Sequence, residues 1–259
     1  MAAVIDYGTQ VLAVADAELR KLRHDFTELI TRAVQPALWL LVFGQVMAQV
    51  RGLAGGGTAY LEFLTPGILS QSVLFVAIFY GINTIWERDA GILNRYLVSP
   101  APRSALVLGK ALSSGVRGLS QAAVVYFLAL FLGIEVSGNL WHLLGVILFI
   151  ALGAGVFSTF SVIVACVVKT RERFLGIGQV LSMPIFFASN AIYPIDLMPR
   201  WLQIISRLNP LTYEVDALRG LMLRGGTSGI GVAPDLAVLA AVFAAFVAIA
   251  ARLYPRMGE

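Results

Sequence analysis

Cysteine and histidine are scarce in this chain of 259 residues. The one cysteine, Cys166, lies in an apolar run, where a thiol packs as a small hydrophobe and has no second thiol in the chain to pair with. The two histidines, His24 and His142, fall on opposite sides of the arrangement predicted below. We therefore expect no disulfide within the chain and no metal centre built from one chain alone.

Charge is scarce as well. Only 13% of the residues are charged, 58% are hydrophobic, and the mean hydropathy is +0.82. A soluble domain carries about 25% charged residues, so this composition indicates a membrane protein. The net charge of +4 does not require a nucleic-acid partner, because basic residues collect in the cytoplasmic loops of membrane proteins.

Long apolar runs are what the sequence has in abundance. A helix needs about 20 mostly apolar residues to cross a bilayer. Six runs meet this requirement, and they cover residues 33–50, 63–85, 118–134, 140–168, 174–195 and 236–253. We predict an all-α polytopic membrane protein with six transmembrane helices in one domain, 1–259, whose membrane region is 33–253. The fifth run contains Pro184 and Pro194, so we expect it to be bent or broken.

The segment before the first run is amphipathic. From Val11 to Ile30 the larger apolar residues recur at helical spacing, and basic residues such as Arg20 and Arg23 take other faces. This pattern predicts a helix that lies along the membrane surface within a cytoplasmic or interfacial segment, 1–32, although a soluble helix packed on a core would show it too. Acidic residues interrupt the segment, so we expect it to be retained and not cleaved as a signal peptide.

The longest connection, 196–234, lies between the fifth and sixth runs. Two short amphipathic helices are predicted in it, at Met198 to Ile205 and Leu211 to Leu223, with a break at Asn209-Pro210. Most of the 19 Lys and Arg residues lie in the N-terminal segment, the second and fourth connections and the C-terminal tail. Because basic loops stay in the cytoplasm, we predict that both termini are cytoplasmic and that this connection faces outward from a bacterial inner membrane.

The sequence offers no energy source of its own for transport. Its nearest approach to a phosphate-binding loop, Ser104 to Ala111, lacks the first glycine and the final hydroxyl residue. The interiors of the six runs contain essentially no Asp, Glu, Lys or Arg, which disfavours ion coupling. We therefore expect a separate ATP-hydrolysing subunit to drive any transport, and no enzymatic activity in this chain.

A membrane-embedded enzyme is the alternative from another functional class. It would need acid, histidine or cysteine groups that converge in one half of the bilayer. The candidate carboxylates are Glu87 with Asp89 and Glu214 with Asp216. Residues two apart on a helix point about 200° away from each other, so neither pair can readily share a site.

Three stretches of the sequence closely resemble the type-2 ABC exporter permeases. They are WERDAGILNRYLVSPAP (Trp86 to Pro102) with SALVLGK (Ser104 to Lys110), the stretch Val168 to Ile195, and NPLTYEVDALRGLM (Asn209 to Met222). Within that superfamily they are similar to the branch of daunorubicin-resistance permeases and nodulation-factor exporter permeases. The resemblance implies six transmembrane helices, an N-terminal connecting helix, and short outer helices before the last span.

The resemblance also implies partners. Two permease copies would pair as a homodimer among membrane lipids, and each copy would rest on one ABC ATP-binding subunit, which binds ATP and Mg while this chain holds no cofactor. Coupling to the ATPase would fall to Glu87, Arg88, Asp89, Gly91 and Arg95 on a coupling helix, with Leu22 and Phe26 on the N-terminal helix. From the residues alone, composition favours a solvated loop after the second run, with arginines that snorkel to the membrane interface.

The second and fifth runs resemble the spans that line the path between two permeases. The path candidates are Gln71, Ser72, Phe75, Phe79, Phe186, Phe187 and Asn190. Ordinary helix packing explains the same residues. An aromatic, weakly polar and uncharged path suits export of an amphipathic drug or lipid-like molecule. The alternative is a permease for a polysaccharide or lipid-linked glycan, which needs a wider polar channel.

Overall fold

The described part of the chain is almost entirely helical. The computed structural model describes residues 8, 9, 11, 12, 16, 33–48, 60–91, 102–168 and 170–254. No strand occurs among these residues, and the one isolated β-bridge joins Val136 to Leu223. Most of the predicted N-terminal helix, including Leu22 and Phe26, lies outside the described residues.

Four helices in the described part are long and apolar enough to cross a membrane. The first is the stretch 60–89, which consists of α4 (Tyr60–Tyr80) and α5 (Ile82–Asp89). The others are α7 (Arg103–Phe131), α8 (Leu140–Val167) and α12 (Val232–Leu253). They overlap the second, third, fourth and sixth runs predicted from the sequence.

The first and fifth runs form shorter helices. The helix 33–47 includes η1 (Trp39–Gly44) and α3 (Gln45–Met47). The fifth run forms α9 (Arg171–Phe187), which carries Pro184 in its last turn and ends three residues later. The expected break is thus confirmed, because the chain from 188 to 194 is not helical and Pro194 precedes the single turn η2 (Ile195–Leu197).

The third helix begins much earlier than its apolar run predicts. It starts at Arg103, directly after Pro102, whereas the apolar run begins at Gly118. The sequence-based count placed Lys110 and Arg117 in a loop, yet both side chains are buried on α7. Their charge could be accommodated because other helices supply a carboxylate for Lys110 and an aromatic ring for Arg117.

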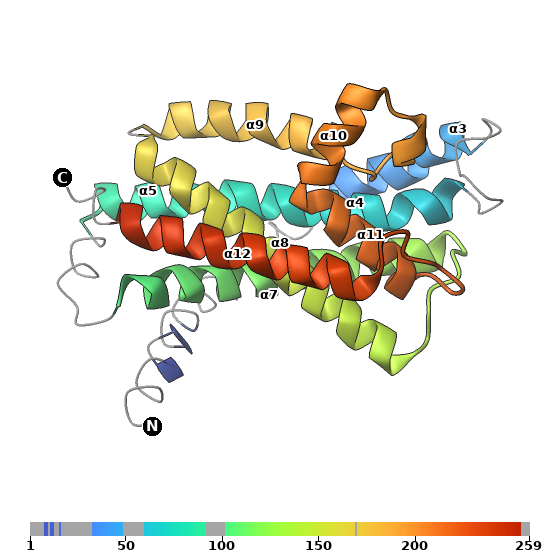
Figure 1. Ribbon diagram of the computed structural model, residues 1–259, viewed down its shortest axis with the longest axis horizontal. Coiled ribbons are helices and arrows are strands. Elements are labelled where there is room, and N and C mark those ends of the chain that lie inside the picture. The colour runs from blue at the N-terminus through green and yellow to red at the C-terminus, as the bar shows by residue number, and fades with distance from the viewer. Residues whose placement is uncertain are drawn as a thin grey trace.

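The helix α8 forms the centre of the bundle, where it packs against α7, α12, α4 and α11 (Figure 1). In the view of Figure 1, α9 and α10 lie along one side and α7 along the other. Small residues allow close approach: Gly118 of α7 lies against Ala154 of α8, and Gly81 lies against Ser161, whose hydroxyl donates to the Ile78 carbonyl.

Two short helices separate α9 from α12, as predicted. They are α10 (Arg200–Leu208) and α11 (Pro210–Met222). Asn209 stands between them and caps α11, because its side-chain oxygen accepts the Leu211 amide at 3.0 Å. Pro210 suits the first position of a helix, since its missing N–H would have no partner there.

Candidate functional site

A small pocket lies between the helix 33–47, α4 and α7. It encloses about 240 Å³, and its lining residues are Gln35, Ser72, Phe75, Val76, Phe79 and Gln121. The rings of Phe75 and Phe79, one turn apart on α4, stack with centroids 6.2 Å apart. The pocket thus combines two aromatic faces with two carboxamides and a hydroxyl, and none of its lining side chains is charged.

The structure divides the predicted path residues into three groups. Ser72, Phe75 and Phe79 line the small pocket, whereas Phe187 lines a larger one at the far end of α9. The remaining three, Gln71, Phe186 and Asn190, are buried in helix packing. The ring of Phe186 packs edge-on against Trp39 at 5.6 Å, and the Asn190 carbonyl accepts a hydrogen bond from Arg219 at 2.9 Å.

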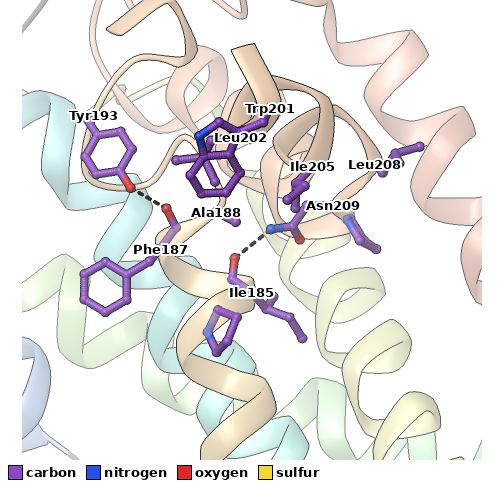
Figure 2. Close-up of a pocket in the computed structure, with 11 residues that line it drawn as sticks. Ile185, Phe187, Ala188, Tyr193, Trp201, Leu202, Ile205, Leu208 and Asn209 are labelled. Carbon is purple, nitrogen blue, oxygen red and sulfur yellow. Dashed lines mark hydrogen bonds between the residues drawn. The ribbon is translucent and has the colours of Figure 1, made fainter. Parts of the chain in front are cut away.

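The larger pocket encloses about 560 Å³ between α9 and α10 and is mostly apolar (Figure 2). The last carbonyls of a helix lack intrahelical donors. Here two pocket side chains supply donors for these carbonyls. The Tyr193 hydroxyl donates to the Phe187 carbonyl at 2.5 Å, and the Asn209 amide donates to the Ile185 carbonyl at 2.6 Å. Both donors therefore satisfy carbonyls in the last turn of α9.

Ionisable side chains are buried on α11. The Arg219 guanidinium lies over the Phe63 ring at 3.9 Å, and burial lowers the pKa of Arg219 to about 10 against the opposing effect of Asp216. Glu214 is fully buried against Gly153 of α8. Neither carboxyl oxygen of Glu214 has a hydrogen-bond partner among the described residues, and desolvation raises its pKa well above the ordinary value.

The neighbouring Asp216 has a different role. Its carboxylate accepts the backbone amides of Gly229 and Ile230 at 3.1 and 2.8 Å and the Ser228 hydroxyl at 2.6 Å. It thereby orders the turn that leads into α12. Glu214 and Asp216 thus face different surroundings, as their two-residue spacing predicts.

The opposite end of the bundle carries a second group of charges. Glu87 of α5 is buried and accepts a hydrogen bond from the Lys110 ammonium of α7 at 2.5 Å. Asp89, two residues further along α5 and exposed, accepts the Arg171 guanidinium of α9 at 3.0 Å. That guanidinium also lies over the ring of Trp86 at 4.1 Å. Glu87 and Asp89 therefore hold two different helices and share no site.

The other predicted coupling residues are only partly described. Arg88 contacts Asp89 at 3.2 Å, and Gly91 follows α5 with a φ of 71°, a conformation that favours glycine after a helix end. Arg95 lies outside the described residues, as do the rest of 92–101. The predicted role of these residues in contacting an ATPase stays a prediction.

Sequence reasoning missed Lys110, Arg117, Gln121 and Gln35. A signal was present for the first two, because positions seven apart share one helix face and the serines between them extend a polar stripe. In the structure, Tyr80 of α4 meets this stripe: its hydroxyl lies 2.8 Å from the Ser113 hydroxyl, and its ring lies under Arg117 at 4.9 Å. No local pattern marks the two glutamines, since their pocket forms only when three helices meet.

Comparison with known proteins identifies the chain's relatives. Residues 9–223 match the ABC-2 type transporter family. A putative transport permease, ycf38, of Cyanophora paradoxa is 33% identical over 74% of this chain and 67% of its own length. A daunorubicin resistance ABC transporter permease protein of Streptomyces coeruleorubidus is 29% identical over 90% of this chain and 81% of its own length. Nodulation protein J of Rhizobium leguminosarum bv. trifolii is 25% identical over 75% of this chain and 74% of its own length.

These matches confirm the resemblance that the three sequence stretches indicated. The long apolar helices, the break of α9 and the pair of short helices before α12 fit a membrane permease, and the family match covers all but the last of these helices. The chain belongs to the ABC-2 type transporter family, as a membrane permease subunit of an ABC transporter.

Proposed function

We propose that this chain is the permease of an ATP-driven exporter that moves an amphipathic drug or lipid-like molecule out of a bacterial cell. The family match over 9–223 is the observation that carries the proposal. Two features of the structure support it. The small pocket offers aromatic and uncharged polar groups together, and the charged contacts at the end of α5 lie where a soluble partner could reach Asp89.

In this proposal the chain is one membrane domain that crosses the inner membrane six times. The four long helices supply four crossings, and the helix 33–47 and α9 supply the other two. An even number of crossings leaves both termini in the cytoplasm. The end of the bundle at α5 then faces the cytoplasm, and α10 and α11 lie toward the outside.

The substrate path is proposed to run where two copies of the permease meet. Ser72, Phe75 and Phe79 would contact the substrate from the small pocket, and Phe187 from the larger one. Gln71, Phe186 and Asn190 would set the packing of the helices behind that path, since they are buried. Aromatic faces with a few hydrogen-bonding groups suit a molecule that has both apolar and polar parts.

The energy would come from two copies of an ABC ATP-binding subunit, which bind ATP and Mg. Arg88, Asp89, Gly91 and Arg95, with Leu22 and Phe26 of the N-terminal helix, are the proposed contacts with that subunit, and the buried Glu87 would transmit its motion from within the permease. ATP binding would move the segment after α5 and shift the permease pair from an inward-open to an outward-open state. Such a shift needs a substrate whose affinity differs between the two states.

Purification of the full-length tagged protein from native membranes in mild detergent tests this proposal. We expect a stoichiometric co-purifying chain with a phosphate-binding loop, found by mass spectrometry, and ATP hydrolysis that vanadate inhibits. Recovery of the intact, folded permease without such a chain would point to a stand-alone channel or carrier instead.

The same preparation tests the path. We expect Phe75→Ala to reduce substrate-stimulated ATP hydrolysis about tenfold, which corresponds to the loss of one aromatic contact with the substrate. The matched control is Phe127→Ala on α7, because Phe127 is 71% exposed and lines neither pocket. Equal effects of the two substitutions would contradict a path through the small pocket.

A further inference from the structure

Among the residues that the structure describes, two ion pairs join α5 to neighbouring helices, and they differ in burial. The first, here called the buried joint, consists of Glu87 on α5 and Lys110 on α7. Its charged atoms are 2.5 Å apart, and the two side chains are only 5% and 3% exposed. Opening such a pair would leave two desolvated charges inside the protein, so the pair stays closed when the helices move.

The second ion pair, here called the exposed joint, consists of Asp89 on α5 and Arg171 on α9. Its atoms are 3.0 Å apart, and both side chains are 38% exposed. Water can replace each partner, and salt screens their attraction. The guanidinium also lies 4.1 Å from the centroid of the Trp86 ring, which holds it over α5 without burying it.

The two joints connect the same short helix to different parts of the molecule. α5 ends at Asp89, a few residues before the segment 92–101 that is proposed to meet the ATPase. α7 carries Gln121 into the small pocket, and α9 carries Phe187 into the larger one. A movement of α5 can therefore be passed to α7 and the small pocket through the buried joint, and to α9 and the larger pocket through the exposed joint.

We infer that the buried joint makes α5 and α7 move as one body, whereas the exposed joint releases α9 during the transport cycle. This inference rests on the proposed function and goes beyond it. It assigns Glu87 and Lys110 as positioning residues within the permease, not as contacts with the ATPase. It also makes the α5–α9 contact the one that opens and closes when the cytoplasmic segment moves.

Hydrogen exchange of the intact permease in lipid nanodiscs tests the joints without any partner subunit. In Glu87→Gln/Lys110→Met both charges are replaced by neutral side chains of similar size, a change that buried ion pairs commonly tolerate. We expect amide exchange in both α5 and the first turns of α7 to rise about tenfold. In Asp89→Asn we expect the rise in the first turn of α9 and not in α7.

Salt distinguishes the joints further. Raising the salt concentration to about 1 M shortens the screening length to about 3 Å. We expect high salt to raise amide exchange in the first turn of α9 of the wild type, as Asp89→Asn does. Amide exchange in α5 and α7 next to the buried joint should not change. Equal responses of α7 and α9 to salt, or faster exchange in α5 alone when the buried joint is removed, would overturn the assignment of one fixed and one releasable joint.

Transport by the reconstituted complex tests the consequence for coupling. We expect Glu87→Gln/Lys110→Met to keep its thermal stability but to move at least about threefold less substrate per ATP hydrolysed. The charge-reversed pair Glu87→Lys/Lys110→Glu should restore the amount of substrate moved per ATP hydrolysed. The matched control is Tyr80→Phe, which removes a hydroxyl contact between α4 and α7 and should leave the ratio unchanged.

The outcomes separate the inference from the proposed function. A neutral double variant that transports as much substrate per ATP as the wild type would show that the ion pair serves stability alone, and would overturn the inference. A wild-type permease that binds no ATPase would overturn the proposed function, and the exchange experiment would still decide whether α7 and α9 are joined to α5 in different ways.

Discussion

Glu214 shows how a single residue can be acidic in sequence and neutral in the folded protein. It is fully buried on α11, and both of its carboxyl oxygens lie without a hydrogen-bond partner among the described residues. An ionised carboxylate in that place would be costly, because no neighbouring group replaces its hydration. Desolvation accordingly raises the pKa of Glu214 well above its ordinary value of 4.5, so the carboxyl keeps its proton to a higher pH than in the unfolded chain.

The stability of the protein should therefore fall as pH rises above the ordinary pKa of Glu214. In the unfolded chain Glu214 loses its proton near pH 4.5, whereas in the folded protein it keeps the proton to a higher pH. Between these two values the folded state binds more protons, so rising pH favours unfolding until the folded pKa is passed. Glu214→Gln stays neutral at every pH and lacks this dependence.

Thermal unfolding in detergent at several pH values, from about 5 to about 8, checks this prediction. We expect the melting temperature of the wild type to fall relative to that of Glu214→Gln across this range. The matched control is Glu172→Gln at an exposed position on α9. Its melting temperature should differ from that of the wild type by the same amount at every pH in this range. Parallel curves for the wild type and Glu214→Gln would contradict a protonated Glu214.

Residue positions could be predicted from the sequence better than residue partners. The resemblance placed Glu87 and Asp89 on one short helix after the second run, and the structure has them on α5. Their partners lie 23 and 82 positions away along the chain. Helical spacing reports which residues share a face of one helix, but it does not report which other helix meets that face.

Elements with strong end signals were predicted well. Asn209-Pro210 separates α10 from α11 because asparagine caps the second helix and proline suits its first position. Elements defined only by hydropathy were predicted less well. The start of α7 was misplaced because its first turns contain charges that are buried, and a hydropathy pattern counts such residues as loop.

Gly67 tests how closely α4 must approach the segment that follows α9. A β-carbon built at Gly67 would lie 2.2 Å from the Ala191 carbonyl oxygen, which belongs to the backbone and cannot turn away. We expect Gly67→Ala to destabilise the fold by about 1–3 kcal/mol, as overpacking of a tight contact does.

Gly115→Ala is the matched control on α7. There the nearest atom to an added β-carbon is 3.5 Å away, an ordinary contact. Alanine favours helix over glycine by about 1 kcal/mol, so Gly115→Ala should be neutral or stabilising. Denaturation of the two variants in the same detergent, followed by circular dichroism, compares them. A Gly67→Ala variant as stable as Gly115→Ala would mean that the segment at Ala191 moves freely away from α4.

At the scale of the whole molecule, composition identified the class of protein but not its arrangement. α8 and α12 are equally hydropathic, yet 67% of the most apolar part of α8 is buried and only 11% of that of α12. Helices that are apolar on every side carry no stripe that marks the core. In a membrane, lipid and protein are similarly apolar surroundings, so the central place of α8 follows from its small residues and its neighbours.

The distribution of basic residues also predicts how the bundle is oriented in the membrane. Ala90 follows α5 at one end, and Gly138 lies between α7 and α8 at the other, and both are exposed. Single cysteines at these positions, in a Cys166→Ser background, report which end faces outward. In intact cells we expect a membrane-impermeant maleimide to label Gly138→Cys and not Ala90→Cys.

Permeabilised cells provide the control, because Ala90→Cys should then react as fully as Gly138→Cys. The reverse pattern in intact cells would place the charges around α5 outside, where no ATP-hydrolysing subunit could reach them, and would contradict the proposed coupling. Labelling of both cysteines in intact cells would require an even number of crossings between them, whereas in the described structure α7 alone connects the two positions. The predicted pattern is thus the one that allows α7 to cross the membrane once and brings the end of α5 to the cytoplasm.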